Sequence, residues 1–373
     1  MKIKPFALER YFAKYEFSAK YLLSASDCDG LLQAEVLSWA DRETKKMWYD
    51  LKLGYTESLG LPLLRQEIAK LYQSISADEV LVVVPEEGIF ITLNTLLEKG
   101  DHVICTWPGY QSLYQVVDYL GCELDKWSPQ ENNGWRFDID ALEKLIKPNT
   151  KLIICNFPHN PTGYLPTKND FQAIIDIAKR HNIYVFSDEM YRFLELNPAE
   201  RLPAACDLYD KAISLFGMSK TFGLAGLRIG WLATKNKELY QQMMIFKDYT
   251  TICSSAPSEI LALIALRAKE KIIARQIKTI SKNLILLDEF FKKHSQLFTW
   301  TRPRASTIGF AKILFPESSL NFCQRVVKDT GIMLLPSTVY DYDDQYFRLG
   351  FGRANMPMVL AEFDKYLQNH PIT

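Results

Sequence analysis

The sequence predicts an α/β fold with a mostly parallel sheet, joined to a smaller α+β domain. Between residues 79 and 232, short and uniformly apolar segments alternate with segments whose apolar residues recur at helical spacing. Uniformly apolar strands separated by amphipathic helices indicate a parallel sheet that is covered on both faces. After about residue 260 this alternation gives way to a long helical stretch rich in lysine and arginine. The chain has 373 residues, 48% of them hydrophobic, which is enough for two domains.

The first expected elements form βαβ units. Each strand is a short β-rich run, and each helix carries an apolar stripe. The expected strands are 79–84, 102–106, 122–127, 151–156, 182–187 and 212–216, and the helices between them are 88–98, 111–120, 139–146 and 170–181.

One further strand, 228–232, is expected to run antiparallel to its neighbours. Only about ten residues separate Phe216 from Arg228, whereas a crossover between parallel strands needs about a dozen or more. Later elements are expected to be a helix through 274–291, strands at 309–314 and 346–351, and helices at 322–328 and 356–369. The large domain is therefore predicted at 45–258, and the small domain at 1–44 and 259–373.

Charge and composition argue against several classes of function. The 44 lysines and arginines balance 44 aspartates and glutamates, so the chain lacks the positive excess of a nucleic-acid or anionic-membrane surface. It has no apolar stretch typical of a signal or a bilayer span. Its seven cysteines form no C-x-x-C pair, and no histidine–cysteine cluster has metal-ligand spacing. We therefore expect a cytoplasmic protein without nucleic-acid, membrane or metal partners.

Polar clusters follow four of the expected strands. They are Thr106–Tyr110, Asn156–Gly163, Ser187–Tyr191 and Gly217–Thr221, and Gly226–Arg228 lies close to the last one. Because ligands of open α/β sheets bind outside the carboxyl ends of the strands, we expect these clusters to share a cleft. They supply the groups that a phosphorylated pyridine cofactor needs. A desolvated lysine is a Schiff-base nucleophile, a buried carboxylate keeps the ring nitrogen protonated, and an arginine binds phosphate.

The order of these motifs resembles that of the fold type I pyridoxal-phosphate (PLP) enzymes of the aspartate aminotransferase family, classes I and II. The matching segments run from about Leu53 to Ala354 and are Gly54–Arg65, Gly100–Asp101, Pro108–Tyr110, Asn160–Gly163, Asp188 with Tyr191, Ser219–Lys220, Gly226–Gly230 and Phe347–Phe351. Each is weak alone, but all of them in family order are specific. The resemblance implies a mostly parallel seven-stranded sheet between helices, a smaller α+β domain, and a homodimer with shared active sites.

The resemblance also implies the catalytic and substrate-binding residues. Lys220 carries the cofactor as a Schiff base and then transfers the proton between substrate and cofactor. Asp188 pairs with the ring nitrogen, while Tyr191 and Asn160 hydrogen-bond to the phenolic oxygen. Arg348 binds the α-carboxylate of the substrate, with Asn160 close to it.

Four further residues are implied to hold the cofactor. Tyr110 stacks on the ring, and Ser219 and Arg228 hold the phosphate. Tyr55 reaches the phosphate in the other subunit. Structural interpretations compete with these roles: Tyr110 as core packing, Asn160 as a turn residue, Arg348 in a structural ion pair and Tyr55 as a plain interface aromatic.

The phosphate-binding segment departs from the family pattern. Where the family has a Gly-Ala or Ser-Gly pair at a helix N-terminus, this chain has Val84-Pro85-Glu86-Glu87-Gly88. Pro85 has no N–H. Glu86 and Glu87 are therefore expected to bind phosphate through their amides while their side chains face away, as first-turn residues. Gly217 stands where many members have a serine that touches the phosphate.

The predicted activity is transfer of an amino group between an amino acid and a 2-oxo acid, in biosynthesis. Ser24–Asp29 and Arg302–Ser306 depart from the family pattern as well. The altered segment 84–88 and the altered N-terminal segment leave a second function open: a PLP-dependent lyase or synthase that eliminates from or cyclises its substrate. Asp27 and Arg304 are candidates for selecting the substrate side chain, but no motif supports them. A third function, a non-enzymatic regulator fused to a DNA-binding domain, is disfavoured by the chain length and by the lack of a basic patch.

Overall fold

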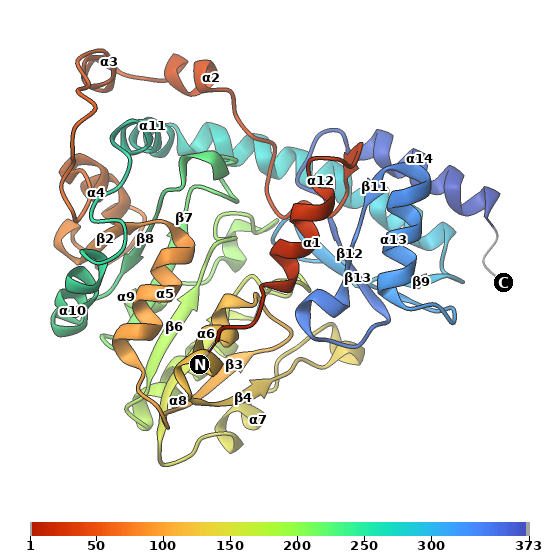
Figure 1. Cartoon of the computed structure of the whole chain (residues 1–373), viewed down its shortest axis with the longest axis horizontal. Coiled ribbons are helices and arrows are strands. Elements are labelled where there is room, and N and C mark those ends of the chain that lie inside the picture. The colour runs from red at the N-terminus through yellow and green to blue at the C-terminus, as the bar shows by residue number, and fades with distance from the viewer. Residues whose placement is uncertain (1, 371–373) are drawn as a thin grey trace.

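The computed structural model describes residues 2–370 and contains the expected seven-stranded sheet (Figure 1). Its strand order is β2-β8-β7-β6-β5-β3-β4. Every neighbouring pair is parallel except the two pairs that involve β8, which confirms the antiparallel strand expected after the short connection. The strands are β2 (Val80–Val83), β3 (His102–Thr106), β4 (Glu123–Trp127), β5 (Thr150–Asn156), β6 (Tyr184–Asp188), β7 (Ala212–Gly217) and β8 (Gly230–Ala233).

Three hydrophobic clusters cover the two faces of this sheet. In β5, Leu152 and Ile154 pack into one cluster, while Ile153 and Cys155 pack into another. This alternation follows from the two-residue period of a strand, and it explains why a strand buried on both sides is uniformly apolar. The helices around the sheet are α4 (Pro62–Ala69), α5 (Pro85–Leu96), α6 (Ser112–Leu120), α7 (Ile139–Lys144), α8 (Lys168–Arg180), α9 (Ala205–Leu208), α10 (Lys237–Lys247) and α11 (Ala256–Arg267).

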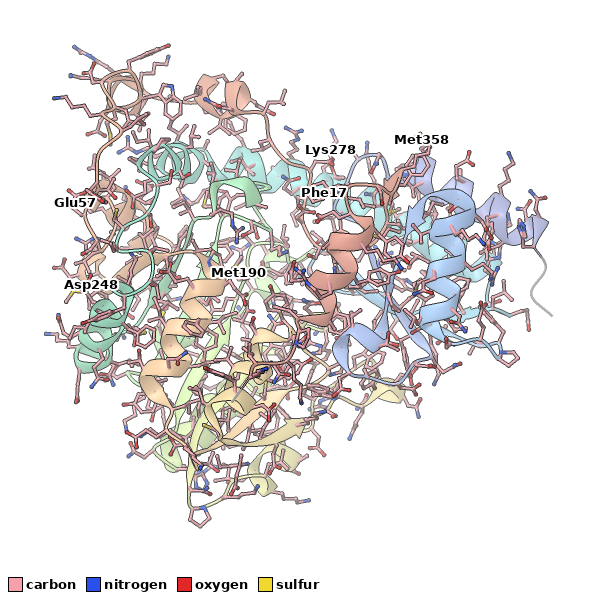
Figure 2. The ribbon with its side chains drawn as sticks, in the orientation of Figure 1. Phe17, Glu57, Met190, Asp248, Lys278 and Met358 are labelled. Carbon is pink, nitrogen blue, oxygen red and sulfur yellow. The ribbon has the colours of Figure 1, made fainter. Side chains whose placement is uncertain are left out.

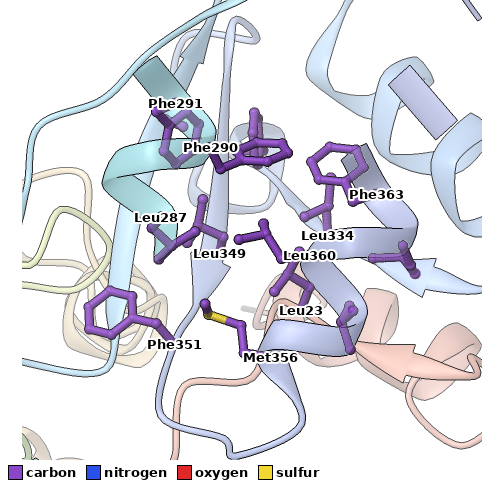
Figure 3. Packing of buried hydrophobic residues seen from close by; sticks show 14 of the residues in the cluster. Leu23, Leu287, Phe290, Phe291, Leu334, Leu349, Phe351, Met356, Leu360 and Phe363 are labelled. Carbon is purple, nitrogen blue, oxygen red and sulfur yellow. The ribbon is translucent and has the colours of Figure 1, made fainter. Parts of the chain in front are cut away.

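A second, antiparallel sheet has the order β12-β13-β10-β9. It packs with long helices around a separate core, part of which is shown in Figure 3. The helices and strands of this part of the chain are α12 (Lys269–Lys293), β9 (Phe298–Thr299), β10 (Ile308–Ile313), α13 (Ser319–Thr330), β11 (Ile332–Met333), β12 (Leu335–Pro336), β13 (Tyr346–Gly350) and α14 (Met356–Asn369).

The N-terminal segment lies against both parts of the molecule. Strand β1 (Tyr21–Leu22) pairs with β11 in parallel. Helix α1 (Ala7–Tyr15) lies between the two sheets in the view of Figure 1, while α2 (Gln33–Ser38) and α3 (Arg42–Tyr49) pack on α11. The domain boundaries at residues 45 and 258 stay predictions. Within residues 2–370, no helix has the length and apolar character needed to cross a bilayer.

Gly350 joins the N-terminal segment to β13, and this contact gives a stability test. The Gly350 amide donates to the Leu23 carbonyl at 2.6 Å. A Cβ at position 350 would lie 1.8 Å from the Ala25 carbonyl oxygen, so backbone must move. We predict that Gly350→Ala lowers the free energy of unfolding by about 2 kcal/mol or more, measured by denaturant unfolding. Gly226→Ala is the control, because nothing lies within 4 Å of its Cβ position. Equal stability of the two variants would contradict this packing.

Candidate active site

The carboxyl ends of β5, β6 and β7 open into a cavity of about 380 Å³. Met190, labelled near the centre of Figure 2, is part of its wall. The cavity brings together most of the residues predicted from the sequence: Glu86, Tyr110, Asn160, Asp188, Tyr191, Ser219, Lys220, Arg228 and Arg348. These residues come from seven separate stretches of the chain, and most of them follow strands of the large sheet, as the strand-end rule predicts.

Lys220 follows β7 and is partly buried in the cavity wall. Its Nζ donates to the Ser26 hydroxyl at 2.8 Å. Burial lowers the pKa of the Lys220 ammonium group because it removes water from the charged form. A lysine with a lowered pKa holds more of its neutral, nucleophilic amine at neutral pH.

Asp188 is the last residue of β6 and is 5% exposed. Its Oδ1 accepts the Met190 amide at 3.1 Å. Burial raises the pKa of Asp188 to about 7, and the nearby Lys220 only partly offsets this effect. A cationic N–H bound next to this carboxyl would favour its charged form again.

A buried hydrogen-bond chain connects the substrate end of the cavity to Asn160. Arg348 is 1% exposed and donates through Nη1 to the Tyr340 hydroxyl at 2.7 Å and through Nη2 to the Ser24 carbonyl at 2.8 Å. The Tyr340 hydroxyl in turn donates to Asn160 Oδ1 at 3.0 Å. Arg348 is therefore held by uncharged oxygens, which leaves its charge available to a carboxylate.

Ser219 and Arg228 lie at the end of the cavity where the phosphate is expected. Arg228 ends the 3-10 turn at Ala225–Leu227 and has a φ of 56°, which is uncommon for a residue other than glycine. Its Nη1 donates to the Ala225 carbonyl at 2.9 Å. Its remaining N–H groups provide donors for a phosphate next to the Ser219 hydroxyl.

Glu87 faces away from the cavity as expected, but the same expectation for Glu86 is wrong. The Glu87 carboxylate accepts the Val84 amide at 3.1 Å. The Glu86 side chain lies in the cavity wall and accepts a hydrogen bond from the Ser112 hydroxyl. Consecutive helical residues point about 100° apart, so both side chains cannot face the same way. Burial raises the pKa of Glu86, which weakens its repulsion of a phosphate.

Pro85 and Gly217, two departures from the family pattern, lie close to each other. Pro85 begins α5 and packs against the β7–β8 turn. A Cβ at Gly217 would lie 3.1 Å from the Pro85 ring, and one at Gly230 would lie 2.7 Å from it. Gly230 Cα (3.0 Å) and the Ile229 carbonyl oxygen (3.1 Å) are at least as close to the Cβ position of Gly217, so the β8 backbone and the proline together fill the space next to position 217.

Two predicted cofactor-binding residues, Glu87 and Tyr55, do not line the cavity. Tyr55 is 91% exposed. Three other large side chains are also exposed: Tyr49 (84%), Leu53 (85%) and Tyr249 (87%). Glu57 and Asp248, which lie close to Tyr55 and Tyr249 in the sequence, are at the same edge of the molecule in Figure 2. A phosphate role for Tyr55 thus requires a second subunit.

Three residues that form hydrogen bonds within the site were not predicted from the sequence. Asn156 lines the cavity, and its Oδ1 accepts the Asn160 amide at 2.8 Å. Ser26 binds Lys220, and Tyr340 links Arg348 to Asn160. Asn156 is the last residue of β5, so the strand-end rule could have identified it. Ser26 and Tyr340 lie in segments without a recognisable motif.

Several features of the cavity fit PLP. Its volume lies within the range of small-molecule sites, and it contains an uncompensated acid, a lysine with a lowered pKa and an arginine beside a serine. Three buried polar groups in its wall, the Tyr191 hydroxyl, Arg348 Nε and Arg353 Nε, have no hydrogen-bond partner among the described residues. Buried polar groups are normally paired, so these groups favour a bound ligand.

Comparisons with known proteins agree with this chemistry. A family model described as aminotransferase class I and II matches residues 19–362. An aspartate aminotransferase of Pyrococcus abyssi is 31% identical over 335 residues, which are 86% of this chain and 85% of that protein. Among solved structures, a PLP-dependent aminotransferase from Streptococcus suis has a TM-score of 0.92 at 30% identity over 99% of both chains. A PLP-dependent cyclase, OrfR, has a TM-score of 0.90 at 26% identity over 99% of this chain and 98% of that one. The chain therefore belongs to the class I and II aminotransferase family, and it is a PLP-dependent enzyme that transfers amino groups between amino acids and 2-oxo acids.

Proposed function

We propose that Lys220 is the residue that binds PLP and transfers the proton during transamination. The observation that carries this proposal is the single cavity that holds Lys220, Asp188 and Arg348 together. When bound, PLP supplies a carbonyl group that condenses with amines and a ring that accepts electrons. The lowered pKa of Lys220 suits both binding through its amine and acting as a general base.

Asp188 is the residue that keeps the ring nitrogen protonated. Its buried carboxyl forms no ion pair with any residue in 2–370, and its Oδ1 accepts the Met190 amide. The Tyr191 hydroxyl, which has no partner among the described residues, and the side-chain amide of Asn160 are the donors for the phenolic oxygen. Tyr110 is held at the cavity by Phe6, with 5.1 Å between the ring centroids, and covers the ring.

Arg348 binds the α-carboxylate of the substrate. Its guanidinium is buried and has no acidic partner among its hydrogen bonds, which go to Tyr340, Asn160 and Ser24. A buried cation without a counter-ion is costly, and a substrate carboxylate supplies that counter-ion.

The functional unit is a homodimer in which Tyr55 reaches the phosphate of the other subunit. The exposure of Tyr55, together with that of Tyr49, Leu53 and Tyr249, supports this proposal, because a partner subunit would cover these large apolar side chains. A cytoplasmic location and a biosynthetic role stay predictions. The alternative of a cyclising or eliminating enzyme is favoured by one observation, the similarity to a PLP-dependent cyclase.

Reductive trapping tests the role of Lys220. We predict that borohydride treatment of the PLP-loaded protein fixes a pyridoxyl group on the peptide that contains Lys220, as seen by mass spectrometry. The control is Lys247→Ala, which should leave the labelling of Lys220 unchanged. Lys247 is buried but donates to the carbonyls of Ser58 and Ile252, outside the cavity. Labelling of any other lysine, or of none, would refute the assignment.

A half-reaction separates transamination from elimination. We predict that, without an acceptor, an amino acid substrate converts the cofactor only once. The reaction then yields one equivalent of 2-oxo acid and no free ammonia, and it continues only when a 2-oxo acid acceptor is added. Ammonia released continuously without an acceptor would instead establish the lyase alternative.

Mixed dimers test whether Tyr55 acts across the subunit interface. A dimer of one Lys220→Ala subunit and one Tyr55→Phe subunit should keep one intact site, with about half the wild-type activity. The Tyr55→Phe homodimer should bind PLP about tenfold more weakly, because a hydrogen bond to a charged group is lost. If the mixed dimer is no more active than the two homodimers, or the protein is a monomer by sedimentation, the shared site is wrong.

A further inference from the structure

Helix α1 forms part of the cavity wall. Four of its residues or cap residues line the cavity: Leu8, Glu9, Phe12 and Glu16. Glu9, Phe12 and Glu16 are three and four positions apart, so they lie along one face of the helix. This face presents two carboxylates, separated by an aromatic ring, to the substrate space.

Contacts with α6 hold α1 in this position. The Ala7 amide donates to Gln111 Oε1 at 2.7 Å, and Gln111 Nε2 donates to the Pro5 carbonyl at 2.9 Å. Leu8 and Tyr11 are buried against the core that contains Phe310 and Tyr340. The two glutamates therefore belong to a packed helix, and their position does not depend on a loose terminus.

The charges of the cavity wall leave these two carboxylates without a partner. The cations of the wall are Lys220, Arg228, Arg348 and Arg353. In the proposed function the first three serve the cofactor and the α-carboxylate, and Arg353 is already paired with Asp27 at 3.0 Å. Neither Glu9 nor Glu16 forms an ion pair with any residue in 2–370.

The same arrangement disfavours a substrate with an acidic side chain. Such a side chain would need a second free arginine beside Arg348, and Arg353 is engaged by Asp27. It would also face Glu9 and Glu16 across the cavity. Both carboxylates are already unfavourable neighbours of each other, since the pKa of Glu16 is raised by burial first and then by Glu9 and Asp27.

We propose that the substrate is an amino acid whose side chain ends in a cation, a guanidinium or an ammonium group, bound by Glu9 and Glu16. This inference rests on the proposed function, in which the buried and partly unpaired Arg348 binds the opposite, carboxylate end of the substrate. Leu8 and Phe12 provide apolar contact for the intervening methylene groups. A long cationic side chain, of lysine or arginine length, would bring its charged end to the carboxylates that α1 contributes to the cavity wall.

The test compares amino acids that differ in charge and little else. The PLP-loaded protein is titrated with L-arginine, L-citrulline, L-lysine, L-aspartate and L-phenylalanine, and the cofactor absorbance gives a dissociation constant and a half-reaction rate for each. Citrulline is the decisive comparison because it is nearly isosteric with arginine but neutral. We expect arginine or lysine to bind at least about tenfold more tightly than citrulline, as lost charge-assisted hydrogen bonds imply. Comparing the dissociation constants of arginine and lysine then shows whether the site prefers a guanidinium or an ammonium group.

Charge-neutral variants assign the effect to α1. Glu9→Gln and Glu16→Gln should each reduce the arginine-to-citrulline ratio, leave citrulline binding unchanged, and weaken the salt dependence of arginine binding. Glu362→Gln is the matched control, because Glu362 is exposed on α14 and does not line the cavity. Unchanged citrulline binding also shows that the variants are folded.

The outcomes separate the inference from the function beneath it. If aspartate or phenylalanine reacts as well as arginine and lysine, or if the glutamine variants keep the wild-type ratio, the cationic substrate is wrong while transamination stands. If no amino acid of any class converts the cofactor, the proposed function fails as well.

Discussion

The parallel register of β5, β6 and β7 is the constraint on which the site depends. Asn156 of β5 pairs with Asp188 of β6, and Asp188 pairs with Leu215 of β7. The three strands therefore end at nearly the same level, and the residues that follow them enter one cavity. A slip of one residue would turn Asp188 to the opposite face of the sheet. The hydrophobic cores on both faces prevent such a slip, because it would exchange residues between two differently packed environments.

The second sheet supplies the other end of the site, and a short polar chain joins the two parts. Arg348 lies in the middle of β13, between Phe310 of β10 and Leu335 of β12. Tyr340 connects it to Asn160 of the large sheet. Since every member of this chain is buried, each hydrogen bond is costly to break. The substrate and cofactor ends of the cavity are thus held at a fixed spacing by side chains as well as by the backbone.

Much of this site could be predicted from the sequence because its groups lie within a few residues of strand ends. Lys220, Asp188 and Asn160 follow apolar runs directly, so the position of the strand determines the position of the side chain. The orientation of Glu86 could not be predicted, because it depends on where α5 begins relative to α6. The close packing around Gly217, which includes the Pro85 ring, could not be predicted from the sequence either. The position of helix α1 at the cavity could not be predicted either, because it depends on a contact between residues far apart in the sequence. Ala7 binds Gln111, which lies 104 residues away.

A crystal structure of the protein loaded with PLP would test the central assignment most directly. We predict continuous density from Lys220 Nζ to the cofactor, with the ring nitrogen within hydrogen-bond distance of Asp188 and the phosphate against Ser219, Arg228 and the Glu86 amide. A phosphate bound elsewhere, or a ring nitrogen facing a group other than Asp188, would contradict the site described above.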